Sequence, residues 1–175
     1  FLQKSVGGNV PPQLLSRCHL KMGLWTREVY EEETKSAYFK DVEVLGKVLG
    51  WFQSAIDLNG DYKAWNAWAL ANFQVVESIE AAALQRAEAQ NSEAPSPGPQ
   101  ESIAHAVHAV QGLVKSIILA RQIALQDILR LLTLWFKYAG NADVEPVLKE
   151  GFQSTPLSAW LQVVPQILAR LRSPS

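Results

Sequence analysis

Basic residues that could bind an anion lie within the first 63 positions of the chain. Arg17 and Lys21 are one helical turn apart, and Lys47 and Lys63 follow in the next two segments. If these segments form stacked helices, the side chains can converge on one concave face and hold a polyanion as point charges. The competing interpretation is an ordinary solvated surface, where basic residues are most often found. The composition leaves both interpretations open.

Other reactive residue types lack the partners that their chemistry requires. His105 and His108 in "HAVH" stand at neighbouring helical positions and could supply two metal ligands, but no third ligand lies nearby in the sequence. Cys18 has His19 beside it, yet consecutive helical residues point in different directions and no orienting partner is visible. No phosphate-binding glycine loop and no zincin, hydrolase or kinase signature occurs. We therefore expect no catalytic site and no metal site in this chain.

The composition is that of a folded chain with balanced charge. Its 175 residues are 48% apolar, and sixteen Lys and Arg against seventeen Asp and Glu leave a formal net charge of −1. Such a chain lacks the basic excess of a nucleic-acid binder, and charged or polar residues interrupt its apolar windows. We expect neither a nucleic-acid partner nor membrane insertion. Cys18 is the single cysteine, which excludes an internal disulfide and fits a reducing compartment.

Apolar residues recur at helical spacing along nearly the whole chain, which predicts an all-α fold. Pro12 suits the first turn of a helix, Asp61 is the expected cap of the third helix, and Thr155 with Pro156 should begin the last. Short connections predict antiparallel hairpins, and hairpins in series form an α-solenoid. The expected helices cover about 12–30, 37–58, 62–90, 103–122, 125–138, 144–152 and 157–171.

One low-complexity segment interrupts this pattern. "NSEAPSPGPQES", residues 91–102, is rich in proline, serine, glycine and glutamate. Such a composition cannot bury enough apolar area to offset the entropy lost on ordering. We predict a flexible, disordered insertion that separates a first helical part, residues 1–90, from a second part, residues 103–175.

Large aromatic and aliphatic residues mark the expected core. In "KAWNAWALANF", Trp65 and Trp68 lie three residues apart on one helix face with Phe73 close to it, a degenerate match to the tetratricopeptide pattern. "LKMGLW" is a second weak match, with Gly23 as its small residue. We expect these aromatics to fill the space between helices rather than to line a ligand site. The predicted core residues are Trp65, Trp68, Phe73, Leu132, Trp135, Phe136, Trp160 and Leu161.

Several of these segments together resemble one family. "KAWNAWALANFQVVE", "AVQGLVKSIILARQIALQDILRLLTLWFKYAG" and "AWLQVVPQILARL" are similar, in this order, to the C-terminal part of the FAT domain of target of rapamycin kinases, which belong to the phosphatidylinositol 3-kinase-related kinases. "RCHLKMGLW" resembles an earlier helix pair of the same region. The resemblance covers nearly the whole chain. It implies tetratricopeptide-like hairpins in residues 1–90 and HEAT-like hairpins in residues 103–175.

The resemblance also implies a function. In that family the FAT domain wraps and clamps the kinase domain, and it takes part in assembly with scaffold subunits. The parent is an ATP-dependent Ser/Thr kinase of nutrient-responsive growth signalling, cytoplasmic and associated with endomembranes through partners. This chain would be a non-catalytic piece of such a parent, in contact with the kinase domain and other parts of the same polypeptide.

A ligand is implied as well, since some members hold inositol hexakisphosphate in a lysine-rich pocket. Lys47 in "GKVLGWF" stands where a "PKVLQYY"-like segment carries one such lysine, with Gly46 in place of the proline. Lys63, Arg17 and Lys21 are the other candidates. Two alternatives stay open: a stand-alone tetratricopeptide-like adaptor that binds a peptide, and an independent inositol-polyphosphate-binding helical module.

Overall fold

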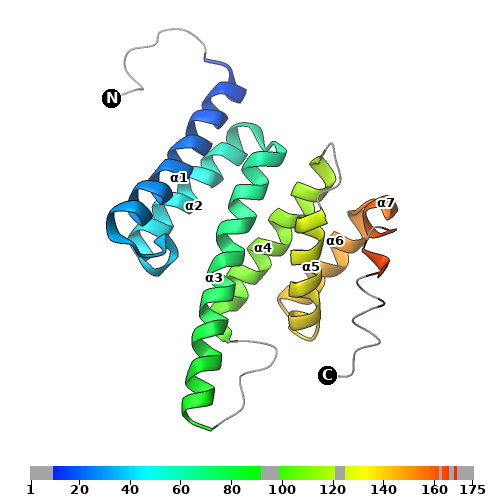
Figure 1. The fold of residues 1–175 in the computed structure, drawn as a ribbon. Coiled ribbons are helices and arrows are strands. Elements are labelled where there is room, and N and C mark those ends of the chain that lie inside the picture. Colours follow the sequence, from blue (N-terminus) through cyan, green and yellow to red (C-terminus); the bar gives the residue numbers. More distant parts are fainter. Residues whose placement is uncertain (1–9, 92–98, 121–124, 162, 166–167, 169–175) are drawn as a thin grey trace. The chain divides into compact units, whose positions relative to one another are not determined.

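The computed structural model describes residues 10–91, 99–120, 125–161, 163–165 and 168 (Figure 1). These residues form helices and contain no strand, so the all-α prediction is confirmed. Contacts divide the chain into two compact units, Phe1–Trp68 and Ala69–Ser175, here called the first and the second unit. The elements are α1 (Pro12–Thr34), the 3₁₀ turn η1 (Tyr38–Lys40), α2 (Val42–Asn59), α3 (Tyr62–Ala89), α4 (Gln100–Leu119), α5 (Leu125–Tyr138), α6 (Val144–Ser154) and α7 (Leu157–Leu161).

The first unit is built on an antiparallel pair, α1 and α2, which lie side by side in Figure 1. Near the start of α1 the buried Ser16 hydroxyl donates a hydrogen bond to the carbonyl of Ala55, 2.7 Å away, late in α2. Farther along α1, Gly23 is buried so closely against α2 that an added Cβ would lie 2.5 Å from the Phe52 ring. The missing side chain therefore allows the two backbones to approach.

Local hydrogen bonds determine where the helices of the first unit begin and end. Two of these helix ends differ from the predicted ones. The predicted end of the first helix near residue 30 is wrong, because α1 continues to Thr34 and ends where Lys35 adopts a left-handed φ of 54°. The second helix begins at Val42, later than predicted, since the Asp41 carboxylate accepts hydrogen bonds from the backbone N–H groups of Glu43 and Val44. The predicted cap Asp61 is confirmed by its bond to the Ala64 N–H, 3.0 Å long.

The second unit surrounds a core to which α3, α4, α5 and α6 all contribute. α4 supplies more of its aliphatic side chains than any other helix. α6 approaches α4 at Gly151, where an added Cβ would lie 2.5 Å from Val114. α5 has the bounds that were predicted. The buried residues of this core are Ala69, Phe73, Val76, Ile103, Ala106, Ala109, Val110, Leu113, Val114, Ile117, Ile128, Leu131, Leu132, Leu134, Tyr138, Val144, Leu148 and Val163.

Among the described residues, α4 is the one helix long and apolar enough to cross a membrane by length and composition. Its most apolar window is 56% buried within the protein. The apolar character of α4 is therefore explained by its central place in the core of the second unit.

The division into units falls earlier than the predicted division at residues 91–102. Phe73 and Val76 of α3 pack in the same core as α4, so the later part of this helix belongs with the second unit. The predicted insertion also ends too late, because α4 begins at Gln100 and buries Ser102. Residues 92–98 of the predicted flexible segment lie outside the described residues.

The end of the chain differs from the predicted helix over residues 157–171. α7 is short and ends at Leu161, Val163 lies in a turn, and residues 164, 165 and 168 are again helical. Thr155 is buried and donates to the carbonyl of Gly151, 2.8 Å away, so its side chain closes α6 instead of capping α7 as predicted. Residues 162, 166–167 and 169–175 lie outside the described part of the chain.

Replacing Gly23 with Ala should weaken the α1–α2 pair, because the added methyl group would lie 2.5 Å from the Phe52 ring. Overpacking of this kind costs about 1–3 kcal/mol. Gly46→Ala is the matched control: its methyl group meets nothing within 4 Å, and alanine stabilises a helix by about 0.5–1 kcal/mol relative to glycine. Hydrogen exchange of α1 and α2 peptides, in the protein that carries this segment, measures both changes. Equal protection in the two variants would contradict the close approach.

Candidate functional site

The four predicted anion-binding residues all lie in the first unit. Arg17 and Lys21 are on α1, Lys47 is on α2 and Lys63 is in the first turn of α3. All four are exposed, and none forms an ion pair with another described residue. Their charges are therefore available to a ligand or to a partner.

The hairpin geometry separates Lys47 from the other cations. The hydroxyl of Ser16, next to Arg17, bonds to the carbonyl of Asn59 at the end of α2. Lys63 follows Asn59 closely in the chain, so Arg17 and Lys63 belong to this end of the hairpin. A helix rises 1.5 Å per residue, which places Lys47 about 18 Å from Asn59 along α2. A ligand that contacts all of them must span that distance.

The histidine pair is not arranged as a metal site. His105 Nδ1 lies 2.8 Å from Asn72 Oδ1, so one ring nitrogen already has a hydrogen-bond partner on α3. Burial, and next the neighbouring His108, lower the pKa of His105 below its usual value. Within the described ranges, no group of three His, Cys, Asp or Glu side chains could hold a metal ion.

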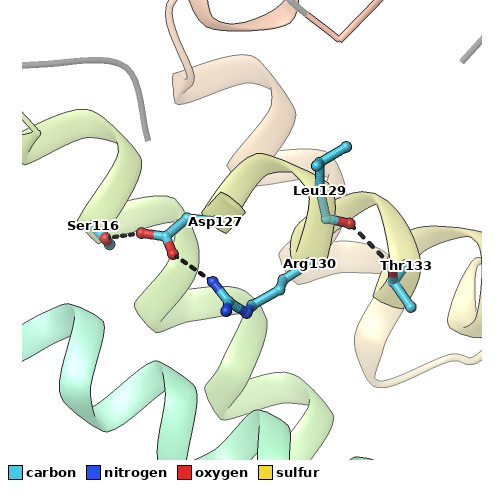
Figure 2. A network of polar contacts seen from close by, with 5 residues as sticks. All are labelled: Ser116, Asp127, Leu129, Arg130 and Thr133. Atoms are coloured by element: carbon cyan, nitrogen blue, oxygen red, sulfur yellow. Dashed lines mark hydrogen bonds and ion pairs between the residues drawn. The ribbon is translucent and has the colours of Figure 1, made fainter. Parts of the chain in front are cut away.

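A buried carboxylate joins α4 to the start of α5. Figure 2 shows Asp127 with one carboxylate oxygen toward Ser116 of α4 and the other toward Arg130. The Ser116 hydroxyl donates to Asp127 Oδ2 over 2.5 Å, and the Arg130 guanidinium donates to Oδ1 over 3.3 Å. Farther along α5 in the same view, Thr133 bonds only within its own helix, to the carbonyl of Leu129. Asp127 is thus a buried charge with hydrogen-bonded partners, and it fixes α5 against α4.

A second polar cluster lies at the other end of α5. The Tyr138 hydroxyl is buried, donates to Glu80 Oε1 over 2.6 Å and lies 2.6 Å from the Ser102 hydroxyl. Lys137 forms an ion pair with the same Glu80 carboxylate. Burial, followed by the bond to Glu80, raises the pKa of Tyr138 above its usual value. Tyr138, on α5, therefore binds both α3 and α4. We call Tyr138 together with Glu80 and Ser102 the tyrosine clasp.

The predicted core aromatics divide into buried and surface residues. Trp68 of α3 is buried in the first unit, and Phe73 and Leu132 are buried in the second. Trp65 and Trp160 are half-buried, with the Trp65 ring 5.9 Å from the Trp68 ring in an edge-to-face arrangement.

The predicted burial is wrong for three residues. Trp135 and Phe136 are 36% and 39% exposed, and Leu161 is 64% exposed. The Trp135 ring stacks on Phe136 and covers the rim between α5 and α6, consistent with the difficulty of enclosing an indole completely. Leu161 ends the short α7, which buries none of its residues.

These surface aromatics form a continuous row across α5, α6 and α7. The ring of Phe136 lies 5.4 Å from that of Trp135, and Trp135 lies 4.7 Å from Phe152. Phe152 in turn lies 4.8 Å from Trp160. We call these four residues the aromatic row. Its rings are ordered by one another and remain partly accessible, as in a contact surface.

The two polar clusters were missed in the sequence, although a signal exists. Asp127 and Tyr138 stand four and seven places from Leu131, at spacings that put all three on the buried side of α5. A carboxylate and a phenol on an apolar helix face need buried partners. Their partners Ser116, Ser102 and Glu80 lie on other helices, so only the fold reveals them.

The chain matches the family model described as "FAT domain" over residues 9–133, from before α1 into α5. It belongs to the FAT domain family. This FAT segment is 34% identical to serine/threonine-protein kinase tor1 of Schizosaccharomyces pombe over 92% of its own length and 6% of that protein. It is 35% identical to serine/threonine-protein kinase mTor of Drosophila melanogaster, over 91% of this chain and 6% of the fly protein. The predicted resemblance is confirmed.

Of these three relatives, the third aligns with the largest share of the FAT segment. It is serine/threonine-protein kinase TOR of Arabidopsis thaliana, 35% identical over 97% of this chain and 6% of the plant protein. The FAT segment therefore spans only about 6% of the length of these relatives.

Tyr138→Phe should loosen the second unit, since the Glu80 carboxylate and the Ser102 hydroxyl lose a buried partner. A lost buried bond of this kind costs about 1–3 kcal/mol. The raised pKa means that the neutral phenol stabilises the fold below pH 10, tyrosine's ordinary pKa, and that this contribution is lost as the pH rises further. Hydrogen exchange of α3, α4 and α5 peptides measures the loss.

Tyr30→Phe is the control for this variant. The Tyr30 hydroxyl makes one longer bond, 3.3 Å to Asp41, in a half-buried position of the first unit. Its removal should change protection far less. Equal effects of the two substitutions, or no effect of Tyr138→Phe, would contradict a stabilising clasp.

Proposed function

We propose that this FAT segment is a non-catalytic regulatory part of a target of rapamycin-type Ser/Thr protein kinase, where it clamps the kinase domain and supports assembly with scaffold subunits. The observation that carries the proposal is the match, over more than nine-tenths of this chain, to about 6% of the length of proteins named serine/threonine-protein kinases. Catalysis then belongs to the rest of the parent, which acts in nutrient-responsive growth signalling. The parent is cytoplasmic and reaches endomembranes through its partners.

The packing of the second unit suits a mechanical role. Asp127 fixes one end of α5 to α4, and the tyrosine clasp fixes the other end to α3 and α4. Buried hydrogen bonds depend strongly on geometry and are costly to leave unpaired. A displacement of one helix therefore moves the others with it, because local rearrangement would leave buried hydrogen bonds unpaired.

The aromatic row offers a surface on which a binding partner can displace these helices. Its rings are held by stacking, and the neighbouring Leu157 and Leu161 are also exposed. A partner that covers these side chains buries apolar area without having to order them first. Within the proposed parent, that partner is the kinase domain or another part of the same chain.

Trp135→Glu in the full-length protein should weaken this contact by placing a charge in the aromatic row. Because the proposed clamp restrains the kinase lobes, its loosening should raise the rate of substrate phosphorylation about fivefold or more, a typical allosteric coupling. Val42→Glu is the matched control, since Val42 is 84% exposed in the first turn of α2, where an acidic side chain is favourable. The measurement is phosphate transfer to a protein substrate, with hydrogen exchange as the check on folding.

An unchanged rate in a folded Trp135→Glu protein would contradict the clamp. A native polypeptide that is little longer than this segment, or one that transfers no phosphate, would contradict the kinase assignment. That outcome would favour the stand-alone adaptor.

We propose, second, that this segment binds inositol hexakisphosphate. This proposal is supported by the exposed cations Lys47 and Lys63, with Arg17 and Lys21 as further candidates, none of them in an ion pair with a described residue. Because Lys47 lies about 18 Å from Asn59 along α2, the ligand and the long side chains together must bridge that separation. A highly charged anion would bind such residues by charge-assisted hydrogen bonds. It would act as a structural ligand that tethers neighbouring helices of the solenoid.

Lys47→Glu should abolish binding of inositol hexakisphosphate to the full-length protein, measured by calorimetry with the free ligand. Lys115→Glu, at an exposed site of α4 in the second unit, is the control and should bind normally. The wild-type affinity should fall as salt is added, because the attraction is screened. Unchanged affinity in Lys47→Glu would remove this lysine from the site.

A further inference from the structure

The turn between α2 and the start of α3 holds a chemically reactive pair of residues. Asn59 ends α2 and Gly60 follows it, and this is the one asparagine of the 175 residues that a glycine follows. In such a pair the backbone nitrogen of the glycine can attack the asparagine carboxamide, because no Cβ shields it and glycine adopts conformations closed to other residues. The turn is therefore a candidate for a spontaneous covalent modification.

The backbone of Gly60 leaves its N–H group without an acceptor. Gly60 has the conformation of an inverse γ-turn, with φ −67° and ψ 69°, and the Asp61 N–H closes the turn by donating to the Asn59 carbonyl, 2.7 Å away. At the ends of α1 and α4 the corresponding N–H groups, of Lys35 and Ala120, bond to a carbonyl of their own helix. The Gly60 N–H donates no hydrogen bond to a described residue. No acceptor therefore holds the proton that this nitrogen must lose.

The side chain of Asn59 is also unrestrained. The residue is half-buried, and beyond the bonds within α2 its hydrogen bonds to described residues use the backbone carbonyl, which accepts from Asp61 and, over 3.1 Å, from the Ser16 hydroxyl. Ser16 bonds to the Ala55 carbonyl as well, over 2.7 Å, so it keeps a partner when the Asn59 contact opens. Since the last residue of a helix frays readily, rotation of Asn59 toward Gly60 needs little free energy.

Packing explains why a glycine stands beside this asparagine. An added Cβ on Gly60 would lie 2.8 Å from Trp65 Nε1 and 3.2 Å from the carbonyl oxygen of Ile56. A larger residue would displace the Trp65 indole, which makes an edge-to-face contact with the buried Trp68. The close approach of Trp65 therefore favours glycine at this position, although glycine exposes Asn59 to attack.

We propose that Asn59 is a deamidation site. The Gly60 nitrogen, after losing its proton to water or hydroxide, forms a bond to Asn59 Cγ. The bond from Cγ to the carboxamide nitrogen breaks, ammonia leaves, and a cyclic succinimide remains. Water then opens the ring at either carbonyl, which gives aspartate or isoaspartate. The step needs no cofactor, and the inference does not rest on the proposed function because it concerns bonds within this segment.

Either product weakens the contact between α1 and the end of α2. A carboxylate at the C-terminal end of α2 opposes the helix dipole, and Asp57 and Asp61 already place negative charge nearby in the sequence. Isoaspartate also routes the backbone through the former side chain, so the carbonyl that Ser16 and Asp61 contact is no longer part of the peptide bond. Deamidation should therefore lower the hydrogen-exchange protection of α1 and α2.

Asn141 is the internal control for the rate. It is half-buried next to a helix end, as Asn59 is, but Ala142 follows it, and its carboxamide oxygen accepts from the Asp143 and Val144 N–H groups over 2.9 and 3.2 Å. The full-length protein is aged at mildly alkaline pH, and both peptides are quantified by mass spectrometry, with isoaspartate labelled by an isoaspartyl methyltransferase. Asn59 should deamidate at least about tenfold faster, because the Asn141 carboxamide must first break two hydrogen bonds.

Two variants separate the structural argument from the sequence motif. Ala142→Gly gives Asn141 a following glycine at an exposed position, with its carboxamide still hydrogen-bonded. Asn141 in this variant should remain at least about tenfold slower than Asn59, for the same two bonds. Asn59→Gln should remain unmodified, since glutamine cyclises far more slowly, and its α1 and α2 peptides should keep the protection that the ageing wild-type protein loses.

Three results would count against the proposal. Asn59 that deamidates no faster than Asn141 in the wild-type protein would overturn the site itself. Equal rates at the two asparagines in the Ala142→Gly variant would overturn the role of the unrestrained carboxamide. Unchanged protection of α1 and α2 after Asn59 has been converted would overturn the predicted loosening.

Discussion

The hydroxyl of Tyr138 is the point on which the second unit depends. Through one oxygen it meets a carboxylate of α3 and a hydroxyl of α4, while its ring lies fully inside the core. A polar atom buried at this depth must find partners, so the three helices have few alternative arrangements that satisfy it. Apolar packing alone would tolerate small sliding movements between the three helices. The tyrosine clasp does not tolerate them, because they would break its buried hydrogen bonds.

The other constraints act where backbones touch. Gly23 allows α2 to approach α1, and Gly151 allows α6 to approach α4. In both places the neighbour is a stiff side chain, Phe52 or Val114, so the contact distance is set by sterics. Close approach and buried polar bonds together make each unit a rigid support, and they leave its outer faces free to carry partners.

Much of this arrangement is readable from the sequence where a signal is local. The bounds of α5 and the cap at Asp61 follow from strong periodicity and from turn chemistry within a few residues. The extent of burial is not local: Trp135 has the same helical register as core residues, yet its ring lies at the rim. Glu80 and Ser102 look like ordinary surface residues until the fold brings Tyr138 to them. Their role depends on contacts between distant segments, which periodicity cannot report.

The tyrosine clasp holds Glu80 of α3 and Ser102 of α4, which lie on either side of residues 92–98 in the sequence, to a single side chain. The chain that joins them therefore starts and ends at two points that one buried side chain holds together. The entropy of closing a loop grows only slowly with its length, so added residues cost little once the ends are pinned. This part of the protein can accept changes of length and composition in evolution, and it is a natural place for an engineered insertion.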